Sequence, residues 1–338
     1  MRTPSTSANN KPISVVVTGG DYFLGNALAT QLLTKGKDDF GRLSVTLVHP
    51  ERGQRLKNAG AELKQINYDD ESSLVNAFNG DVDWVVLIPD PEEDTRVQNT
   101  KRLIDAIQKA GKVGKTGKAA NVILVSVAGA DSKEGNQHKE FLDLETYLKE
   151  KEKNRVVLRT AWISNIFHLW SKYVAVNNKF PLTLEPNQKF APIQLEDVAR
   201  AIRAIIVKQN NSDGAGHRGQ TYTLTGPEQV DGPRIVEPLN RVIGEGKVEY
   251  VTLKREELEN YLRSLRDSDN EHLKNTFPSQ PTDKQIQTIL DELDWIRSGK
   301  ANFRTEDLKN LIGGEGEKVE EFFKRHSAEF SGQSPRKA

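Results

Sequence analysis

Residues 13–25 read ISVVVTGGDYFLG. The first part is a run of apolar, mostly β-branched residues, which is typical of a strand that is buried on both faces of a sheet. Glycines follow at positions 19, 20 and 25, and leucines at 28, 32 and 33 keep the spacing of one helical face. The stretch therefore predicts a buried strand, a tight glycine turn and a helix.

Similar β-branched runs recur along the chain and are separated by amphipathic stretches. We expect seven strands, at residues 13–18, 43–49, 62–67, 83–89, 121–126, 155–160 and 220–225. Strands that alternate with helices are typical of a parallel sheet covered on both faces. The pattern predicts an α/β fold with a doubly wound parallel sheet of the Rossmann type.

After residue 226 the chain becomes heavily charged, with helical patterns near residues 254–266 and 283–297. We expect a smaller, mostly helical C-terminal lobe there. The predicted division is a disordered tail at 1–12, a Rossmann domain at 13–165 completed by 190–226, a substrate or partner lobe at 166–189 and 227–330, and a disordered tail at 331–338.

Composition excludes several classes of function. The 48 basic residues balance the 48 acidic ones, so nucleic acid finds no overall positive charge to bind. The longest apolar run, residues 84–88, has five residues, whereas a membrane helix needs about 18. The chain has no cysteine, and its six histidines include no pair at i,i+3 or i,i+4 spacing. We therefore predict a cytoplasmic protein that can also occur in the nucleus, has no metal site and binds neither nucleic acid nor membrane.

The glycine turn lies where a dinucleotide-binding fold places its phosphate loop, between the first strand and the first helix. Glycine there permits a tight turn, a close approach of backbone to the pyrophosphate, and helix–strand packing, while the helix N-terminus presents the positive end of its dipole. We expect the phosphates to lie against the residues Gly19, Gly20, Phe23, Leu24 and Gly25.

Further segments follow a recognisable pattern: AGAEL at 59–63, NYDD at 67–70, SVAGA at 126–130, VLRTAW at 157–162, EDVAR at 196–200 and DWIRSGK at 294–300. In these segments and in the glycine turn, the chain resembles the NmrA-like family of atypical short-chain dehydrogenase/reductases over nearly all of residues 13–330. The resemblance implies an NAD(P)-binding Rossmann domain, with Asn67 near the adenine and Ile88, Pro89 and Val127 along the nicotinamide side.

Two departures from the family pattern fall on the nucleotide site. Tyr22 takes the place of the middle glycine, where backbone approaches phosphate; its ring either obstructs the site or turns aside and only weakens binding, and the sequence leaves both open. His49 ends the second strand, where the family often has an arginine for the 2′-phosphate of NADP(H). Because Arg52 and Arg55 follow, with Glu51 as the nearby acid, the sequence favours NADP(H) over NAD(H), with an ordinary surface role for His49 as the alternative.

A third departure concerns the reaction itself. Active short-chain reductases carry a tyrosine and, four residues later, a lysine on one helix, and the tyrosine exchanges a proton with the substrate oxygen. When we count back from Arg159 on the sixth strand, the tyrosine position falls on Gln137 and the lysine position on Phe141. Neither side chain can do that chemistry. Ser126 stands in the position of the substrate-binding serine and is therefore a candidate substrate contact.

A tyrosine and lysine with the correct internal spacing do occur nearby. Tyr147 and Lys151 lie only 12 and 8 residues before Arg159, which places them near the end of the helix and away from the nucleotide. We predict that they form a surface pair and name no catalytic residue.

The empty tyrosine and lysine positions favour a non-catalytic NAD(P)(H)-binding regulator that senses the redox state of the nucleotide and reports it to a protein partner. The alternative is an NAD(P)H-dependent oxidoreductase for a quinone, a ketone or a similar small apolar substrate, since hydride transfer itself needs only a well-placed nicotinamide and acceptor. A second alternative is a scaffold whose phosphate site is closed by Tyr22. The sequence identifies neither the partner nor an oligomeric state.

Overall fold

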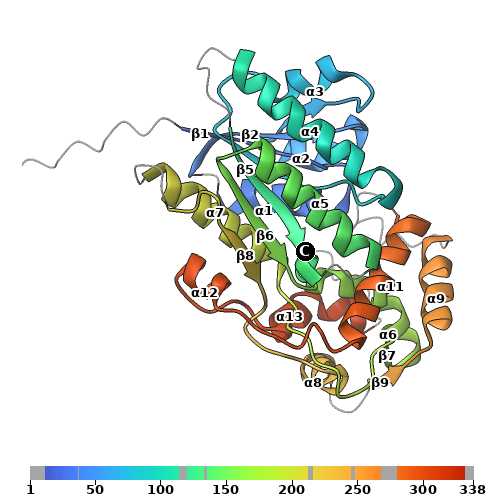
Figure 1. Ribbon diagram of the computed structural model, residues 1–338. Coiled ribbons are helices and arrows are strands. Elements are labelled where there is room, and N and C mark those ends of the chain that lie inside the picture. Colours follow the sequence, from blue (N-terminus) through green and yellow to red (C-terminus); the bar gives the residue numbers. More distant parts are fainter. Residues whose placement is uncertain are drawn as a thin grey trace, which may run out of the picture.

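The computed structural model describes residues 12–36, 38–113, 120–132, 135–211, 216–244, 248–267 and 280–331. The tails predicted at 1–12 and 331–338 lie outside the described residues, apart from Pro12 and Ser331. Figure 1 shows a sheet with helices on both faces and a second group of helices and short strands beyond the ends of its strands.

Seven parallel strands form the main sheet, in the order β3-β2-β1-β4-β5-β6-β8. Their bounds are β1 Ile13–Val17, β2 Phe40–Leu47, β3 Glu62–Gln65, β4 Trp84–Leu87, β5 Asn121–Val127, β6 Arg155–Thr160 and β8 Thr221–Leu224. Every residue of β1 and β4 is buried, because both faces of the sheet are covered. The predicted fold is confirmed, although β2 begins earlier than predicted, at Phe40, which pairs with Ile13.

Separate hydrophobic cores form on the two faces of the sheet. One core involves α1 (Phe23–Lys35), α2 (Gln54–Asn58), α7 (Leu195–Asn211) and α12 (Asp307–Ile312). The other involves α3 (Glu71–Phe78), α4 (Glu93–Val113) and α5 (Gly135–Lys151). Two short 3-10 turns, η1 (Pro50–Gly53) and η2 (Ala130–Ser132), follow β2 and β5. The N-terminus of α1 and the carboxyl ends of the central strands meet at one edge, where doubly wound sheets bind their ligands.

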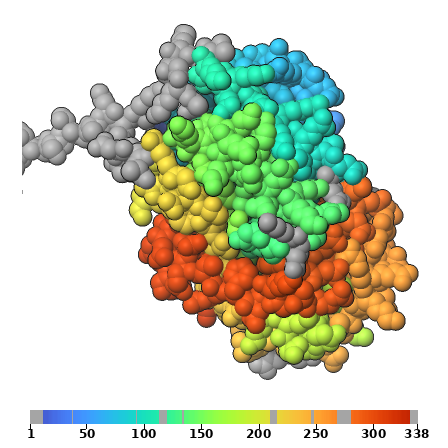
Figure 2. All heavy atoms as spheres, viewed as in Figure 1, coloured from blue at the N-terminus to red at the C-terminus, as the bar shows by residue number. Residues whose placement is uncertain are grey.

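The smaller lobe has a third core, rich in aromatic side chains, in which Trp170, Phe180 and Phe322 are fully buried. Its elements are η3 (Ser164–Trp170), α6 (Ser171–Asn177), β7 (Lys179–Leu182), α8 (Gly232–Ile243), β9 (Glu249–Thr252), α9 (Arg255–Asp267), α11 (Asp283–Arg297) and α13 (Val319–Phe330). In Figure 2 the orange and red C-terminal residues cover the lower side of the blue and green sheet domain. The lobe is mostly helical, as predicted, but it also contains a two-stranded parallel sheet of β7 and β9 that the sequence did not indicate.

Helix α11 joins the two parts of the molecule. It packs against α9 within the lobe and against α4 and α5 of the sheet domain. Residues of α11 line a pocket together with residues at the carboxyl ends of β4 and β5. Figure 1 shows the helix beyond the end of the sheet. No helix within the described ranges is long and apolar enough to cross a membrane.

Candidate functional site

The glycine turn has the backbone geometry that the motif predicts. Gly19 has a φ of +73°, which favours glycine, and a Cβ at Gly25 would lie 2.2 Å from the carbonyl oxygen of Gly19. A Cβ at Gly20 would lie 2.5 Å from Cγ1 of Val45. The Asn26 Nδ2 donates a hydrogen bond to the Gly20 carbonyl at 3.1 Å. The turn, the helix start and the neighbouring strand therefore fit together only with these glycines.

Tyr22 leaves the backbone of the turn unstrained but adds a side-chain ring beside it. The residue has φ −114° and ψ 159°, an extended conformation open to any side chain, and it precedes α1 without a side-chain capping bond among the described residues. The ring is half-buried in the crevice, and burial, followed by the carboxylates of Asp90 and Asp21, raises the pKa of the phenol well above its usual value. The positive end of the helix dipole still faces the crevice, with a phenol beside it.

The end of β4 is fixed to the end of β1. Thr18 Oγ1 donates to the Ile88 carbonyl at 3.1 Å and accepts from the Ile88 N–H at 2.8 Å. Beyond Pro89, the buried Asp90 carboxylate accepts from Thr95 Oγ1 at 2.9 Å and Asn99 Nδ2 at 2.8 Å. The strand end is thereby held rigid where the crevice begins.

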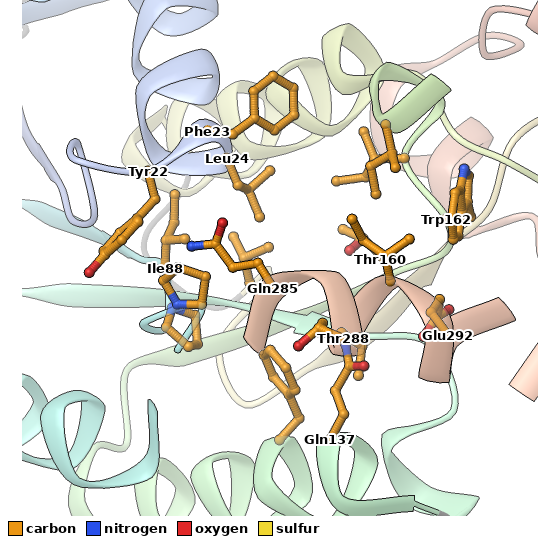
Figure 3. A pocket seen from close by; sticks show the side chains of 18 of the residues that line it. Tyr22, Phe23, Leu24, Ile88, Gln137, Thr160, Trp162, Gln285, Thr288 and Glu292 are labelled. Atoms are coloured by element: carbon orange, nitrogen blue, oxygen red, sulfur yellow. The ribbon is translucent and has the colours of Figure 1, made fainter. Parts of the chain in front are cut away.

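A cavity of about 260 Å³ opens at this point (Figure 3). Its wall is mainly apolar, as is typical of small-molecule sites. The residues that line it are Tyr22, Phe23, Leu24, Ile88, Pro89, Asp90, Pro91, Arg96, Val125, Ser126, Val127, Gln137, Phe141, Thr160, Ala161, Trp162, Ile163, Ile166, Leu169, Pro281, Gln285, Thr288, Ile289 and Glu292. Seven residues predicted from the sequence thus come together here: Tyr22, Phe23, Leu24, Ile88, Pro89, Ser126 and Val127.

The two positions where short-chain reductases carry tyrosine and lysine both face this cavity. Gln137 and Phe141, one turn apart on α5, line its wall. The guanidinium of Arg96 lies 5.4 Å from the centre of the Phe141 ring and pairs with Glu140. An amide and a phenylalanine that lies against an arginine therefore occupy the positions predicted for the proton-transfer pair of short-chain reductases.

Tyr147 and Lys151 lie elsewhere. The Tyr147 hydroxyl is 2.9 Å from both carboxylate oxygens of Asp105 on α4, and Lys151 Nζ is 3.6 Å from the same carboxylate. Neither residue lines the cavity. The structure places this pair between α4 and α5, where it ties two helices together.

Ser126 lines the cavity, but its hydroxyl is engaged. Its Oγ donates to Glu145 at 2.6 Å, and Glu145 receives two hydrogen bonds from Arg159, at 3.0 and 2.7 Å. Arg159 also pairs with Asp131 at 2.6 Å. Ser126 can accept a hydrogen bond from a substrate, while its own proton is held by Glu145.

The residues predicted to contact the adenosine half lie along the ends of β2 and β3. His49, Arg52 and Asn67 are exposed and are not part of the cavity. His49 Nδ1 lies 3.3 Å from Glu51, and Asn67 Oδ1 accepts from the Asp69 N–H at 3.0 Å. We call these exposed segments, which follow β2 and β3 outside the cavity, the rim.

A second acid lies at this rim and was not predicted from the sequence. The buried Asp21 carboxylate accepts the backbone N–H groups of Val48 at 2.6 Å and His49 at 2.8 Å. It places a negative charge at the end of β2, where dinucleotide folds read the adenosine ribose. Glu51 is therefore not the single nearby acid, and the balance of charges that favoured NADP(H) is altered.

The sequence analysis also missed the face of α11 that closes the cavity. Gln285, Thr288, Ile289 and Glu292 recur at intervals of three or four residues and all line the wall. Figure 3 shows Gln285, Thr288 and Glu292 along this helix, with Gln137 reaching from α5. Three of these four residues are polar, so the sequence did not mark this face as a wall of an apolar cavity.

Glu292 is the unusual group of the site. Its side chain is 12% exposed, and its Oε2 has no hydrogen-bond partner among the described residues. His138 Nε2 on α5 lies 3.9 Å away, beyond hydrogen-bond distance. Burial raises the pKa of the Glu292 carboxyl to about 8, so the neutral acid is the main form at pH 7.

Histidines that are far apart in the sequence also meet, outside the cavity. His168 Nδ1 lies 2.7 Å and His326 Nδ1 3.1 Å from the Glu329 carboxylate, and the two ring centres are 4.3 Å apart. Spacing along the chain could not show this cluster, because η3 and α13 bring its members together. Both carboxylate oxygens already accept an imidazole, so the cluster ties the C-terminal helix to the lobe, and the absence of a metal site stays a prediction.

The sheet order and the glycine turn define a protein of the Rossmann class, in which the crevice above the central strands is the ligand site. Residues 14–293 match the NmrA-like family, and the chain belongs to this family, which confirms the resemblance noted in the sequence.

Individual relatives carry different activities. The chain is 24% identical over 212 residues to quinone oxidoreductase 2 of Escherichia coli, covering 63% of this chain and 68% of that protein. The structure of the NADPH-dependent E. coli quinone oxidoreductase with NADPH is similar with a TM-score of 0.72, at 20% identity over 92% of this chain and 99% of that one.

Two other solved structures share the fold. Triphenylmethane reductase of Citrobacter sp. gives a TM-score of 0.71, at 18% identity over 95% of this chain and 100% of that one. Nmra, a negative transcriptional regulator in complex with NAD, gives 0.64, at 13% identity over 93% and 94%. Reductases and a regulator therefore have the same architecture.

The residues of this crevice fit a nicotinamide dinucleotide. The close contact between Gly25 and Gly19 preserves the loop that receives pyrophosphate, and α1 presents its N-terminus without a side-chain cap among the described residues. Ile88, Pro89 and Val127 give an apolar wall for a flat ring. The ring of Tyr22 is the feature that works against a tight fit.

Proposed function

We propose that this protein is an NAD(P)H-dependent reductase that accepts a small, apolar carbonyl compound of the quinone or ketone class. The observation that carries the proposal is the apolar cavity of about 260 Å³ that continues from the phosphate loop along the ends of β4, β5 and β6. A protein that only bound the nucleotide would not need the additional wall that α11 supplies. The likeness to quinone oxidoreductase 2 supports the same class of acceptor.

In this proposal the chain binds the nucleotide, orients the nucleotide and the acceptor toward each other, and excludes water from the cavity. The phosphate loop and the α1 N-terminus hold the pyrophosphate, and the rim at β2 holds the adenosine ribose. Ile88, Pro89 and Val127 orient the ring from which the bound nucleotide supplies hydride. Ile289 and Trp162 place the acceptor against that ring and keep water out, so that proximity provides most of the rate.

The test is calorimetric titration with NADPH and NADH, followed by turnover with menadione and a panel of apolar ketones. A matched pair of variants locates the acceptor: Ile289→Trp fills the cavity, and Ile312→Trp adds the same volume on α12, away from it. We expect Ile289→Trp to keep nucleotide binding and lose turnover, while Ile312→Trp keeps both. Nucleotide binding without turnover of any acceptor would contradict the proposal.

A second candidate is a regulator that reports the nucleotide to a protein partner. It is favoured by one observation, namely that Gln137 and Phe141 occupy the tyrosine and lysine positions. For this function, NAD(P)H and NAD(P)⁺ must bind with different affinities, and a menadione assay must show no turnover. Equal affinity for the oxidised and reduced forms would exclude such a redox report.

A further inference from the structure

We infer that Glu292 of α11 is the proton donor to the carbonyl oxygen of the acceptor, in place of the tyrosine that α5 lacks. This inference rests on the reductase function proposed above and names the group that completes its reaction. Glu292 and Gln137 line the same cavity from facing helices, so the donor has moved from one wall to the other.

The position of Glu292 gives it access to a ligand and little to water. Its side chain is 12% exposed, it borders the cavity, and its Oε2 has no hydrogen-bond partner among the described residues. A buried polar atom without a partner is costly in a folded protein and marks a place where a bound group completes the site. Two other buried polar atoms of the wall, Gln137 Oε1 and Trp162 Nε1, share this property.

The charged groups around Glu292 do not counteract the desolvation that favours its neutral carboxyl form. The titratable and charged groups on the surrounding walls that the structure describes are His138 on α5, Arg96 with its partner Glu140, and Asp90 and Tyr22 at the phosphate-loop end. Arg96 is held by Glu140 and by the Asp90 and Pro91 carbonyls. Desolvation is therefore the effect that raises the pKa of Glu292.

The proton and electron balance is simple. A reduced nicotinamide held at the phosphate loop would supply a hydride to one carbonyl oxygen of the quinone, which would form one O–H bond and leave a negative charge on the other carbonyl oxygen. The Glu292 O–H bond then breaks as an O–H bond forms on that oxygen, giving a hydroquinone and a Glu292 carboxylate. A proton from solvent then restores the neutral Glu292 carboxyl group. Overall, one quinone, one reduced nucleotide and one proton give one hydroquinone and one oxidised nucleotide.

The experiment compares Glu292→Gln with Asp291→Asn. The control removes an exposed carboxylate of α11 that pairs with Arg255 of α9. Infrared spectra of the full-length protein across the pH range report the C=O stretch of a protonated carboxyl group. We expect a band that titrates near pH 8 in the wild type and in Asp291→Asn and is absent from Glu292→Gln. Menadione turnover with NADPH should fall at least about 100-fold in Glu292→Gln and stay unchanged in Asp291→Asn.

The pH profile separates a donor from a structural residue. Wild-type kcat/KM should decline above about pH 8 as Glu292 loses its proton, and this decline should be missing from the residual activity of Glu292→Gln. Two results would overturn the donor role of Glu292 and leave the proposed function standing. One is a wild-type turnover rate and a wild-type pH profile in Glu292→Gln. The other is the absence of an infrared band that titrates at a higher pH than an ordinary carboxyl group. No wild-type turnover of any acceptor would overturn the proposed function and the donor role with it, while the infrared band would still report the protonation of Glu292.

Discussion

The phosphate loop and helix α5 have both departed from the family pattern, with different consequences. In the loop, Tyr22 replaces a glycine, yet its backbone is extended and the contacts among Gly19, Gly20 and Gly25 are intact. On α5, Gln137 and Phe141 replace the proton-transfer pair, and nothing on that helix takes over the chemistry. The phosphate loop has the backbone contacts of the motif and differs in one side chain. Helix α5 has its place in the fold but carries no tyrosine or lysine at the two predicted positions.

The difference follows from what each site demands. A phosphate loop works through backbone geometry, which a ring at one position obstructs without destroying. Proton transfer works through one ionisable group, which cannot be approximated by an amide or a phenyl ring. The proposed reductase therefore needs a proton donor on another element, and α11 with Glu292 is the wall that faces α5.

The largest expected effect concerns the framework of the loop. Gly25→Ala places a Cβ 2.2 Å from the Gly19 carbonyl oxygen, so the strand–helix connection must shift. We expect a loss of about 3 kcal/mol or more in the free energy of unfolding, measured by denaturant titration, together with loss of NADPH binding. Gly314→Ala is the control, because its Cβ would meet nothing within 4 Å. Wild-type stability in Gly25→Ala would show that the loop is not a rigid framework.

The next largest effect concerns Glu292 on α11, the wall opposite α5, and is a change of stability with pH. The pKa of Glu292 is near 8 in the folded protein and about 4.5 in the unfolded chain, so the native state keeps this proton up to a higher pH. Between these values the unfolded chain binds fewer protons, and stability must fall as the pH rises. The wild type should therefore lose about 1.4 kcal/mol per pH unit relative to Glu292→Gln, with no relative change below about pH 4.

Denaturant titrations at about pH 5, 6.5 and 8 measure this difference directly. Asp291→Asn serves as the control, since its carboxylate is exposed and paired with Arg255. A constant difference between wild type and Glu292→Gln across this range would mean that Glu292 titrates like an exposed carboxyl. The cavity would then have no neutral carboxyl group at Glu292, and nothing on α11 would replace the proton donor that α5 lacks.

The sheet could be predicted from the sequence because its strands are buried on both faces. The run Trp84–Leu87, for example, is continuously apolar for this reason. The β7–β9 pair could not be predicted in the same way. Each strand has only four residues, β7 contains Pro181, and the β9 residues are half-buried or exposed, so neither strand has a distinctive pattern.

The site could be predicted where a local motif reports it. Counting back from Arg159 gave the position of Gln137 and Phe141 on α5, and the hydrogen bonds between Arg159 and Glu145 give that register its physical basis. Asp21 and Glu292 could not be found in this way. Their roles arise from contacts with the end of β2 and with the far side of the cavity, which exist only after folding.

A smaller effect decides what the tyrosine in the loop does. Tyr22→Gly removes a half-buried ring from the crevice beside the α1 N-terminus and keeps a good residue at the helix cap. We expect NADPH to bind about tenfold more tightly in a calorimetric titration, which is about 1.4 kcal/mol. Tyr22→Ala separates the two contributions, because it removes the ring and keeps the Cβ. Equal affinity in all three proteins would mean that the ring turns aside when the nucleotide enters.

The smallest effect concerns the choice of nucleotide at the other end of the loop. The Asp21 carboxylate lies against the N–H groups of Val48 and His49, where a 2′-phosphate would meet a second negative charge in a partly desolvated site. Asp21→Asn should therefore raise the ratio of NADPH to NADH affinity about fivefold, measured by paired titrations at one salt concentration. Glu51→Gln, at an exposed position beside His49, should change the ratio much less because water and salt screen it. If Glu51→Gln changed the ratio of NADPH to NADH affinity more than Asp21→Asn, then Glu51 at the rim, and not Asp21 in the loop, would determine the choice of nucleotide.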